Sequence, residues 1–389
     1  MKDVYIVDYI VKDCLGSDVS SNYKSMPNTP GATPVIRYNP DDVPNILCKK
    51  GFHMQHVDES YTTYKLTVDL CNEIIDKYIE VIPKDAAVIF GSFTAGTRIR
   101  DELVTSLNSG STRYSPTRLF QGNHDLLSAL LAGKLKLEGI NTSLNGACTS
   151  SMFNLHFAAM LIQTGQTSAA IVGNAEMPIE SKMQYHWQCT SALSTLGGGF
   201  CAPFDKKRDG FLQGEGGTLW FICDEETLQQ HNLTPKAKIR SIVSGAKVTS
   251  MTAHDRTCEN QLKLINQALT QANLTAQDIS FFNAHATSTL VGDDIEVDVF
   301  QKAFPEIDIP IVSLKGYIGH TMSACGLIES AYGLEAIKNG FLHPNYNLTE
   351  PLSDDPRLIT DRKNLNGNIF MKASFGFGGR TNISIFESV

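Results

Sequence analysis

The chain has 389 residues, of which 42% are hydrophobic and 19% are charged, as is ordinary for a globular protein of two or three domains or of one duplicated domain. Its net charge of −8 lacks the basic excess of nucleic-acid-binding proteins. The nine cysteines are odd in number and include no CxxC pair, so they indicate neither a zinc site nor a disulfide framework. We expect a protein of the reducing cytoplasm, without a metal ion and without a nucleic-acid partner.

The chain begins with an apolar run, residues 4–11, that is interrupted by acidic residues, which is typical of a strand and not of a signal peptide. No stretch approaches the roughly 20 apolar residues of a membrane span, so we expect none. Residues 14–60 are rich in Ser, Asn, Pro and Asp and show little periodicity, which predicts a long irregular segment.

The rest of the chain alternates between helical and strand patterns. Helices are expected over residues 60–78, 123–135 and 260–273, and strands over residues 86–91, 140–144, 169–176, 218–223 and 237–244. A long glycine-rich loop is expected between residues 177 and 217. The loop at residues 91–96 follows the carboxyl end of a strand, where α/β folds hold ligands.

The two halves of the chain share a short motif. Ser-Leu-Asn-Gly at 143–146 and Ser-Leu-Lys-Gly at 313–316 each precede an apolar helix, and these helices end at Gly165 and Gly340. This repetition predicts a duplicated α/β fold in which two equivalent central helices pack together. We expect the two halves to comprise residues 1–230 and 231–389.

One cysteine, Cys148, lies where a short polar turn enters an apolar helix. Apolar residues recur after it at helical spacing, at 152, 155, 158, 159 and 162. Because the N–H groups and the dipole of a helix N-terminus favour a thiolate, we expect the thiol pKa to fall from about 8.5 toward neutral if a histidine also lies close. Cys148 is therefore a candidate nucleophile. The alternative, a buried structural cysteine, is the commoner case for a cysteine taken alone.

Two histidines lie in settings that a core histidine does not need. His285 follows an apolar strand end and leads into Thr287 and Thr289, whereas His320 stands among glycines and small residues at a helix start. A helix start disfavours a cation, so we expect a neutral imidazole at His320. Each alone is equally well explained as a core or capping histidine, but together with Cys148 they indicate a catalytic site.

Five motifs in one order carry a resemblance to a known family. They are Ala-Cys-Thr-Ser at 147–150, Pro-Phe-Asp-x-x-Arg-Asp-Gly-Phe-x-x-Gly-Glu-Gly at 203–216, Asn-Ala-His-x-Thr-Ser-Thr-x-x-Gly-Asp at 283–293, Lys-Gly-x-x-Gly-His-Thr-x-x-Ala-x-Gly at 315–326 and Ser-Phe-Gly-Phe-Gly-Gly at 374–379. From about residue 86 onward the chain resembles the elongating β-ketoacyl-[acyl-carrier-protein] synthases. The resemblance implies a thiolase-like fold, with α/β layers in α-β-α-β-α order built from two similar halves.

The resemblance also implies a reaction. The enzyme would transfer an acyl group to Cys148 and then extend it by two carbons through decarboxylative Claisen condensation with malonyl carrier protein, in fatty acid or specialised type II polyketide or polyene synthesis. His285 and His320 would act on the malonyl thioester, and Lys315 and Glu329 would hold the surrounding network. The implied oxyanion hole and gate are Cys148, Phe377 and Gly378, and the implied substrate contacts are Thr287, Thr289 and Phe375. No cofactor of its own is implied, because phosphopantetheine is carried by the partner.

The resemblance further implies an acyl carrier protein as partner and a homodimer or a heterodimer with a second ketosynthase-like subunit. A non-catalytic chain-length factor is one alternative, although such proteins typically lose the cysteine. A coenzyme A thiolase is the other, but it would use a second catalytic cysteine near the C-terminus, and none follows Cys325, which we interpret as a packing residue. The chain departs from the family pattern in its opening and at Arg380.

A negatively charged enzyme can attract an acidic carrier protein only through a local basic cluster. The candidates lie in loops that flank the predicted site: Arg98, Arg100, Arg113, Lys206, Lys207 and Arg208. We expect Lys206 and Lys207 to be exposed and Arg208 to be tied internally.

Overall fold

The computed structural model of the protein describes residues 1–26, 47, 50–55, 57, 61–111, 113–121, 123–195, 201–251 and 255–389, with all of their side chains except those of Arg98 and Ser181. Most of the expected irregular segment, residues 14–60, lies outside the described residues. Its described part contains the helix α1 (Val19–Ser25), which was not predicted. The carboxylate of Asp18 caps this helix by accepting hydrogen bonds from the backbone N–H groups of Ser20 and Ser21.

Ten strands form one continuous sheet in the order β3-β2-β4-β5-β1-β6-β12-β11-β7-β8. The strands of the first half are β1 (Val4–Asp13), β2 (Ala87–Gly91), β3 (Asn141–Thr142), β4 (Ala169–Glu176) and β5 (Gly216–Cys223). Those of the second half are β6 (Ala237–Ala246), β7 (Phe281–Asn283), β8 (Ile311–Val312), β11 (Ile369–Gly376) and β12 (Arg380–Ser388). The short strands β9 (Phe341–Leu342) and β10 (Lys363–Asn364) pair separately.

Both halves of the sheet have the same strand order and the same strand directions. β2 is parallel to β3 and β4, and β4, β5 and β1 follow as antiparallel neighbours. β7 is likewise parallel to β8 and β11, and β11, β12 and β6 follow as antiparallel neighbours. The halves join where β1 pairs with β6, with Val4 opposite Ile239. The duplicated α/β fold is therefore confirmed, whereas its division between residues 230 and 231 stays a prediction.

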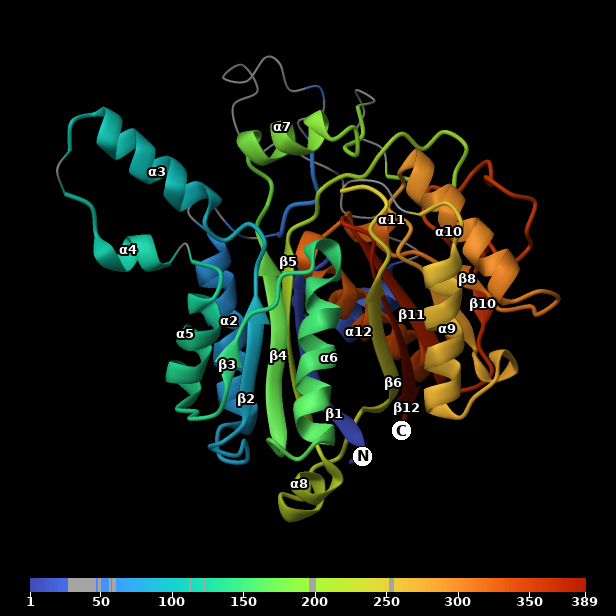
Figure 1. Ribbon diagram of the computed structural model, residues 1–389, viewed down its shortest axis with the longest axis horizontal. Helices are drawn as coiled ribbons and strands as arrows, with labels where there is room; N and C mark the ends of the chain where they lie inside the picture. The colour runs from blue at the N-terminus through green and yellow to red at the C-terminus, as the bar shows by residue number, and fades with distance from the viewer. Residues whose placement is uncertain are drawn as a thin grey trace.

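The helices complete five layers (Figure 1). α6 (Ser150–Gln163) and α12 (Cys325–Asn339) lie between the two halves of the sheet; α2 (Thr63–Tyr78) and α5 (Leu126–Leu135) cover the outer face of the first half, and α9 (Glu259–Ala272) and α10 (Leu290–Ala303) cover that of the second. α2 buries one apolar face, with Leu66, Leu70 and Ile74, whereas α12 is buried on nearly every side, as a central helix must be. This is the expected α-β-α-β-α order.

The remaining helices lie near the edges of these layers. α3 (Thr97–Asn108) and α4 (Pro116–Phe120) form an arm that projects from the body beside α2 and α5 (Figure 1). α7 (Ser181–Cys189), α8 (Glu225–Gln230) and α11 (Lys315–Ile318) are short. The prediction of an uninterrupted loop over residues 177–217 is wrong at α7, which buries the polar Gln184 as well as Trp187 and so shows no clear apolar period. Within the described ranges, no helix has the length and apolar character needed to cross a membrane.

Candidate active site

Cys148 lies in a single 3-10 turn, Ala147–Thr149, that leads directly into α6. Ala147 adopts the left-handed conformation, with φ of 55°. Hydroxyl groups hold the turn, because Thr149 Oγ1 donates to Gly146 O at 2.6 Å and Ser150 Oγ donates to Ala147 O at 2.6 Å. The cysteine therefore lies in a fixed turn at the start of the helix, as predicted. We call this turn, Ala147–Thr149, the cysteine corner.

The second half of the chain repeats this corner. The 3-10 turn Met322–Ala324 precedes α12, and Met322 has φ of 46°, so that Ser323 occupies the position equivalent to Cys148. Gly146 directly precedes the first corner, whereas residues 317–321 separate Gly316 from the second. The two halves can therefore be aligned through the Ser-Leu-x-Gly motif only up to its glycine. The second half then has the additional residues 317–321, and His320 is one of them.

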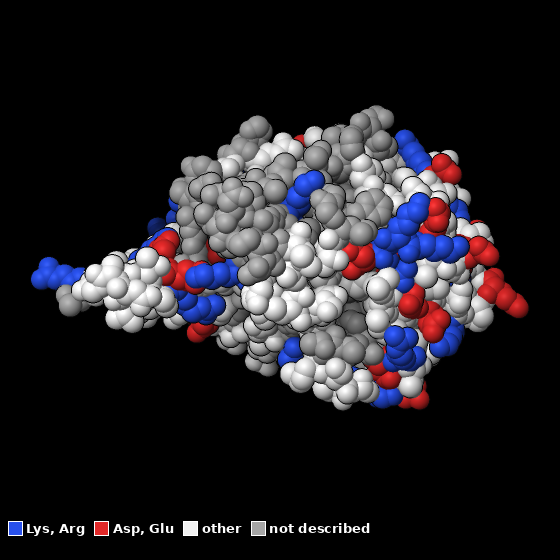
Figure 2. Space-filling model, turned by 90° about the horizontal axis from the view of Figure 1, so that it is seen from above, with Lys and Arg blue, Asp and Glu red and all other residues white. Residues whose placement is uncertain are grey.

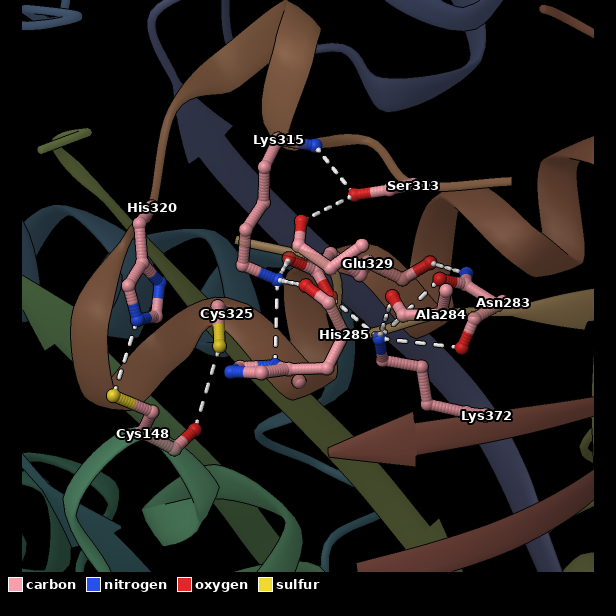
Figure 3. A network of polar contacts seen from close by, with 12 residues as sticks. Cys148, Asn283, Ala284, His285, Ser313, Lys315, His320, Cys325, Glu329 and Lys372 are labelled. Atoms are coloured by element: carbon pink, nitrogen blue, oxygen red, sulfur yellow. Dashed lines mark hydrogen bonds and ion pairs between the residues drawn. The ribbon is translucent and has the colours of Figure 1, made fainter. Parts of the chain in front are cut away.

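A cavity of about 380 Å³ lies beside Cys148 and draws its lining from both halves of the chain. The predicted site residues that line it are Cys148, His285, Thr287, Thr289, His320, Phe375 and Phe377. Thr287 Oγ1 and Thr289 Oγ1 lie 3.0 Å apart. Of the other predicted residues, Lys315 and Glu329 lie behind His285, as Figure 3 shows, and Gly378 lies in the turn after Phe377.

Cys148 and His320 are in direct contact, since Cys148 Sγ lies 3.1 Å from His320 Nε2 (Figure 3). Burial raises the pKa of Cys148 to about 12, and the charge of Lys315 opposes this only in part. Burial, with Lys315 and Lys372, lowers the pKa of His320 well below its usual value. The neutral His320 is therefore confirmed. The expected fall of the thiol pKa is wrong, because loss of hydration outweighs the helix N-terminus.

His285 is held from behind by a buried ion pair. Lys315 Nζ lies 2.5 Å from Glu329 Oε1, and it also donates to His285 O at 2.5 Å. The same ammonium lies 3.4 Å from His285 Nδ1. Because an ammonium can only donate, Nδ1 is the acceptor and a neutral imidazole carries its proton on Nε2. Burial lowers the pKa of Lys315, but Glu329, Cys325 and Glu296 together raise it above its usual value, so the lysine stays charged.

A second buried lysine, Lys372, binds the other oxygen of Glu329, and the sequence analysis missed it. Lys372 Nζ lies 2.5 Å from Glu329 Oε2 and donates to Ala284 O at 3.0 Å and to Asn283 Oδ1 at 3.3 Å (Figure 3). The side chain is fully buried. Its position in the otherwise apolar start of β11 is the signal that could have revealed it, because a lysine is almost never buried unless it is paired.

Three potential metal ligands also meet here. One ligand atom each of His285, Cys325 and Glu329 lies within 4.8 Å of the others. Both oxygens of Glu329 are already bonded to ammonium groups, whose charge disfavours a metal cation at this point. Cys325 Sγ instead donates to Cys148 O at 3.3 Å, so Cys325 packs against the nucleophile turn.

The β11–β12 turn brings Phe377 to the cavity. Gly378 and Gly379 have φ of 78° and 67°, a conformation that other residues rarely adopt. A Cβ on Gly376 would lie 2.9 Å from Gly146 O, so only a glycine lets the turn come this close to the cysteine corner. Arg380 Nη1 donates to Phe377 O at 3.2 Å, which ties the residue that departs from the family pattern to this turn.

Trp187 of α7 also lines the cavity and was not predicted. Its ring centre lies 5.9 Å from that of Phe377, 5.7 Å from Phe211 and 6.0 Å from Phe93. Phe93 belongs to the loop after β2, which the sequence predicted to lie near a ligand. An aromatic wall therefore closes one side of the cavity and suits an apolar chain.

The exposure of Lys206, Lys207 and Arg208 is as predicted, but the prediction that all candidates lie in loops is wrong for Arg98 and Arg100, which belong to α3. Arg100, Arg113, Lys206 and Lys207 are exposed, whereas Arg208 is only 5% exposed. Arg208 Nη2 pairs with Asp294 at 2.6 Å, and Lys207 Nζ pairs with Glu350 at 2.6 Å. The side chain of Arg98 lies outside the described part. Seen from above, basic side chains stand next to acidic ones at both ends of the described surface (Figure 2).

Two family models match the chain in succession. The model described as "Beta-ketoacyl synthase, N-terminal domain" matches residues 78–227, and the one described as "Beta-ketoacyl synthase, C-terminal domain" matches residues 237–349. The chain belongs to the β-ketoacyl synthase family. It is 31% identical to 3-oxoacyl-[acyl-carrier-protein] synthase I, chloroplastic, of Arabidopsis thaliana, over 80% of this chain and 68% of that protein. It is 28% identical to 3-oxoacyl-[acyl-carrier-protein] synthase 2 of Coxiella burnetii, over 73% and 70%.

Solved structures show the same fold. A β-ketoacyl synthase of Burkholderia phymatum aligns with a TM-score of 0.89 and 23% identity over 100% of both chains. The ishigamide ketosynthase/chain length factor aligns with a TM-score of 0.88 and 20% identity, over 100% of this chain and 99% of that one. The thiolase-like fold is confirmed. This β-ketoacyl synthase is an acyltransferase that forms a carbon–carbon bond by decarboxylative condensation, and chain elongation in fatty acid or polyketide synthesis is its function.

Proposed function

We propose that Cys148 is the nucleophile that accepts the acyl group and that His285 and His320 act on the malonyl thioester. The observation that carries this proposal is the 3.1 Å contact between Cys148 Sγ and His320 Nε2 inside a cavity that His285 also lines. The thiolate is the reactive form of cysteine. Because loss of hydration raises the pKa of the Cys148 thiol, it needs a base beside it, and the neutral imidazole of His320 supplies one.

In the first half-reaction, His320 takes the thiol proton as Sγ of Cys148 attacks the acyl thioester. A new C–S bond to Cys148 forms, the old C–S bond breaks, and His320 returns the proton to the departing thiolate, so no proton is gained or lost. The backbone N–H groups of Cys148 and Phe377 stabilise the oxyanion of the tetrahedral intermediate. The close approach of the Phe377 turn to the cysteine corner supports this assignment.

In the second half-reaction, the malonyl thioester loses CO2, and the electrons of the broken C–C bond form an enolate. The Nε2–H group of His285 donates to the enolate oxygen, and His320 also donates from Nε2 after its proton has exchanged from Nδ1 to Nε2 through solvent. The enolate carbon attacks the acyl group on Cys148, the C–S bond breaks, and the released thiolate takes up one proton from solvent. The product is two carbons longer than the acyl group that entered.

We infer that both substrates arrive on the phosphopantetheine of an acyl carrier protein, so that the enzyme needs no cofactor of its own. The hydroxyl groups of Thr287 and Thr289 are suited to bind the pantetheine amides, and Phe375 would contact the chain. A chain from the solved complex of a type II polyketide acyl carrier protein with its ketosynthase aligns with this chain at a TM-score of 0.89 and 18% identity, which supports a carrier protein as the partner. The exposed Arg113, Lys206 and Lys207 are the proposed docking residues, whereas Arg100 shares a face of α3 with Val104 and Leu107.

We also propose a dimer, either with a second copy or with a second ketosynthase-like subunit. The arm of α3 and α4 exposes Val104 (52%), Leu107 (69%), Leu119 (41%) and Phe120 (54%). An apolar surface of this kind marks a binding site for another protein. A Leu107→Glu/Phe120→Glu variant should be monomeric in sedimentation velocity when the native protein is dimeric, and an unchanged dimer would place the interface elsewhere.

The decisive experiment on the nucleophile is intact-mass analysis after incubation with acyl thioesters of a bacterial acyl carrier protein. The native protein should gain one acyl group, and Cys148→Ala should gain none while keeping its fold, because alanine fits the corner. Cys189→Ala is the matched control, since Cys189 is an exposed cysteine that lies outside the cavity lining. An adduct on the Cys148→Ala variant would remove Cys148 as the nucleophile.

A further inference from the structure

Lys372 has no part in the mechanism above, although it lies against the residues that hold His285. Three kinds of oxygen surround its ammonium: the carboxylate of Glu329, the backbone carbonyl of Ala284 and the side-chain carbonyl of Asn283. Burying an ammonium is unfavourable unless such partners replace water. Lys372 also shares the Glu329 carboxylate with Lys315, so one buried carboxylate serves two buried lysines.

The two lysines fix the carboxylate from opposite sides. Each oxygen of Glu329 lies 2.5 Å from one ammonium. Asn283 Nδ2 donates to Glu329 O at 2.8 Å, which ties α12 to the strand end that delivers His285. Without Lys372, one carboxylate oxygen would lose its ammonium, and Glu329 would be free to rotate away from Lys315.

We propose that Lys372 is a positioning residue for the condensation half-reaction: it fixes Glu329, and through Glu329 it holds Lys315 against Nδ1 of His285. This contact keeps the imidazole proton on Nε2, where it can be donated to the malonyl thioester oxygen. The inference rests on the roles proposed above for His285 and Lys315. Acyl transfer uses His320 instead, and no hydrogen bond of Lys372 reaches His320.

Lys372 acts on the site by its charge as well. Two ammonium groups and one carboxylate leave one net positive charge behind the histidines, which favours the enolate. The titratable groups around His320 are Cys148 at 3.1 Å, the His285 ring at 5.5 Å and the cluster of Lys315, Glu329 and Lys372. Removing the charge of Lys372 should therefore raise the pKa of His320. The acid limb of the pH profile, where the rate of CO2 release falls as His320 becomes protonated, should then move to higher pH.

The test compares three variants in two separate assays. Lys372→Met removes the charge and the donor, Lys372→Gln keeps a donor without the charge, and Lys338→Met is the matched control because Lys338 is an exposed lysine of α12. Acylation of Cys148 by hexanoyl carrier protein and CO2 release from malonyl carrier protein, both made with a bacterial carrier protein, are each measured against pH. Lys372→Met should slow CO2 release about 10- to 100-fold, the range seen when a group that orients a metal-binding histidine is removed.

At neutral pH, acylation by Lys372→Met should change far less than CO2 release, and the acid limbs of both pH profiles should move to higher pH because His320 acts in both half-reactions. Lys372→Gln should lose less activity than Lys372→Met but show the same shift of the limb. Equal loss in both assays, an unmoved limb, full activity, or failure of both variants to fold would each overturn the positioning role. If instead the native protein neither acylates nor releases CO2, the proposed function fails, and the two failures are thus distinguishable.

Discussion

Glu329→Gln should destabilise the protein more than any single change at its surface. Glutamine keeps the shape of the side chain but removes the one carboxylate that neutralises Lys315 and Lys372, both at 2.5 Å and all three fully buried. Removing one partner of a buried ion pair costs about 3–5 kcal/mol. Because two ammonium groups lose their counter-charge here, we expect a loss near the upper end, about 5 kcal/mol.

The assay is urea unfolding followed by circular dichroism, with Glu350→Gln as control. Glu350 also pairs with a lysine, Lys207 at 2.6 Å, but both side chains are more than half exposed, so the control should unfold like the native protein. The pH dependence gives a second check. Burial and Lys315 already lower the pKa of Lys372, and loss of Glu329 should lower it further.

A lysine whose pKa is lower in the folded state than in the unfolded state binds fewer protons when folded. Stability of Glu329→Gln should therefore rise with pH above neutral, as Lys372 loses its proton in the folded protein. A loss below about 1 kcal/mol, the range of exposed pairs, would refute the view that this carboxylate holds two charged lysines.

Three further outcomes are expected. Alkylation of Cys148 by iodoacetamide, followed by peptide mapping, should rise about tenfold per pH unit from pH 7 to 9, because the thiol pKa is about 12; a plateau near neutral pH would indicate an ion pair with His320 instead. His285→Ala should lose CO2 release from malonyl carrier protein while largely keeping Cys148 acylation, and equal loss of both would contradict the division of roles. Lys206→Glu should raise KM for acyl carrier protein with little change in kcat, and the effect should shrink above 0.1 M salt, where the screening length falls below about 10 Å; an unchanged KM at low salt would place docking elsewhere.

Features that depend on neighbouring residues could be read from the sequence. The central helices α6 and α12 follow from apolar runs that end at Gly165 and Gly340, where both glycines have positive φ. The corner at Cys148 was predictable because small residues surround it. Lys372 was missed because its partners lie far away along the chain, with Glu329 43 residues and Ala284 88 residues distant. The packing of α12 against β11 brings Glu329 to Lys372, and the pairing of β7 with β11 brings Ala284.

The wrong pKa of Cys148 has the same origin. A helix N-terminus is a local feature and was recognised, but the loss of hydration around Sγ depends on the histidines, aromatic rings and glycine turn that the fold brings together. For a buried group this loss is the larger effect. Reactivity at Cys148 therefore depends on the base beside it more than on the helix that carries it.

That base is present because the duplication is imperfect. At the second corner Ser323 takes the place of the cysteine; its hydroxyl donates to Glu176 and accepts from Asn174 Nδ2 at 3.1 Å, so this corner anchors β4. The additional residues 317–321 before it reach back to the first corner and put His320 against Cys148. The first corner thus carries the nucleophile, whereas the second corner has a structural role. Shortening 317–321 to match the first half would keep both helices and remove the contact between base and nucleophile.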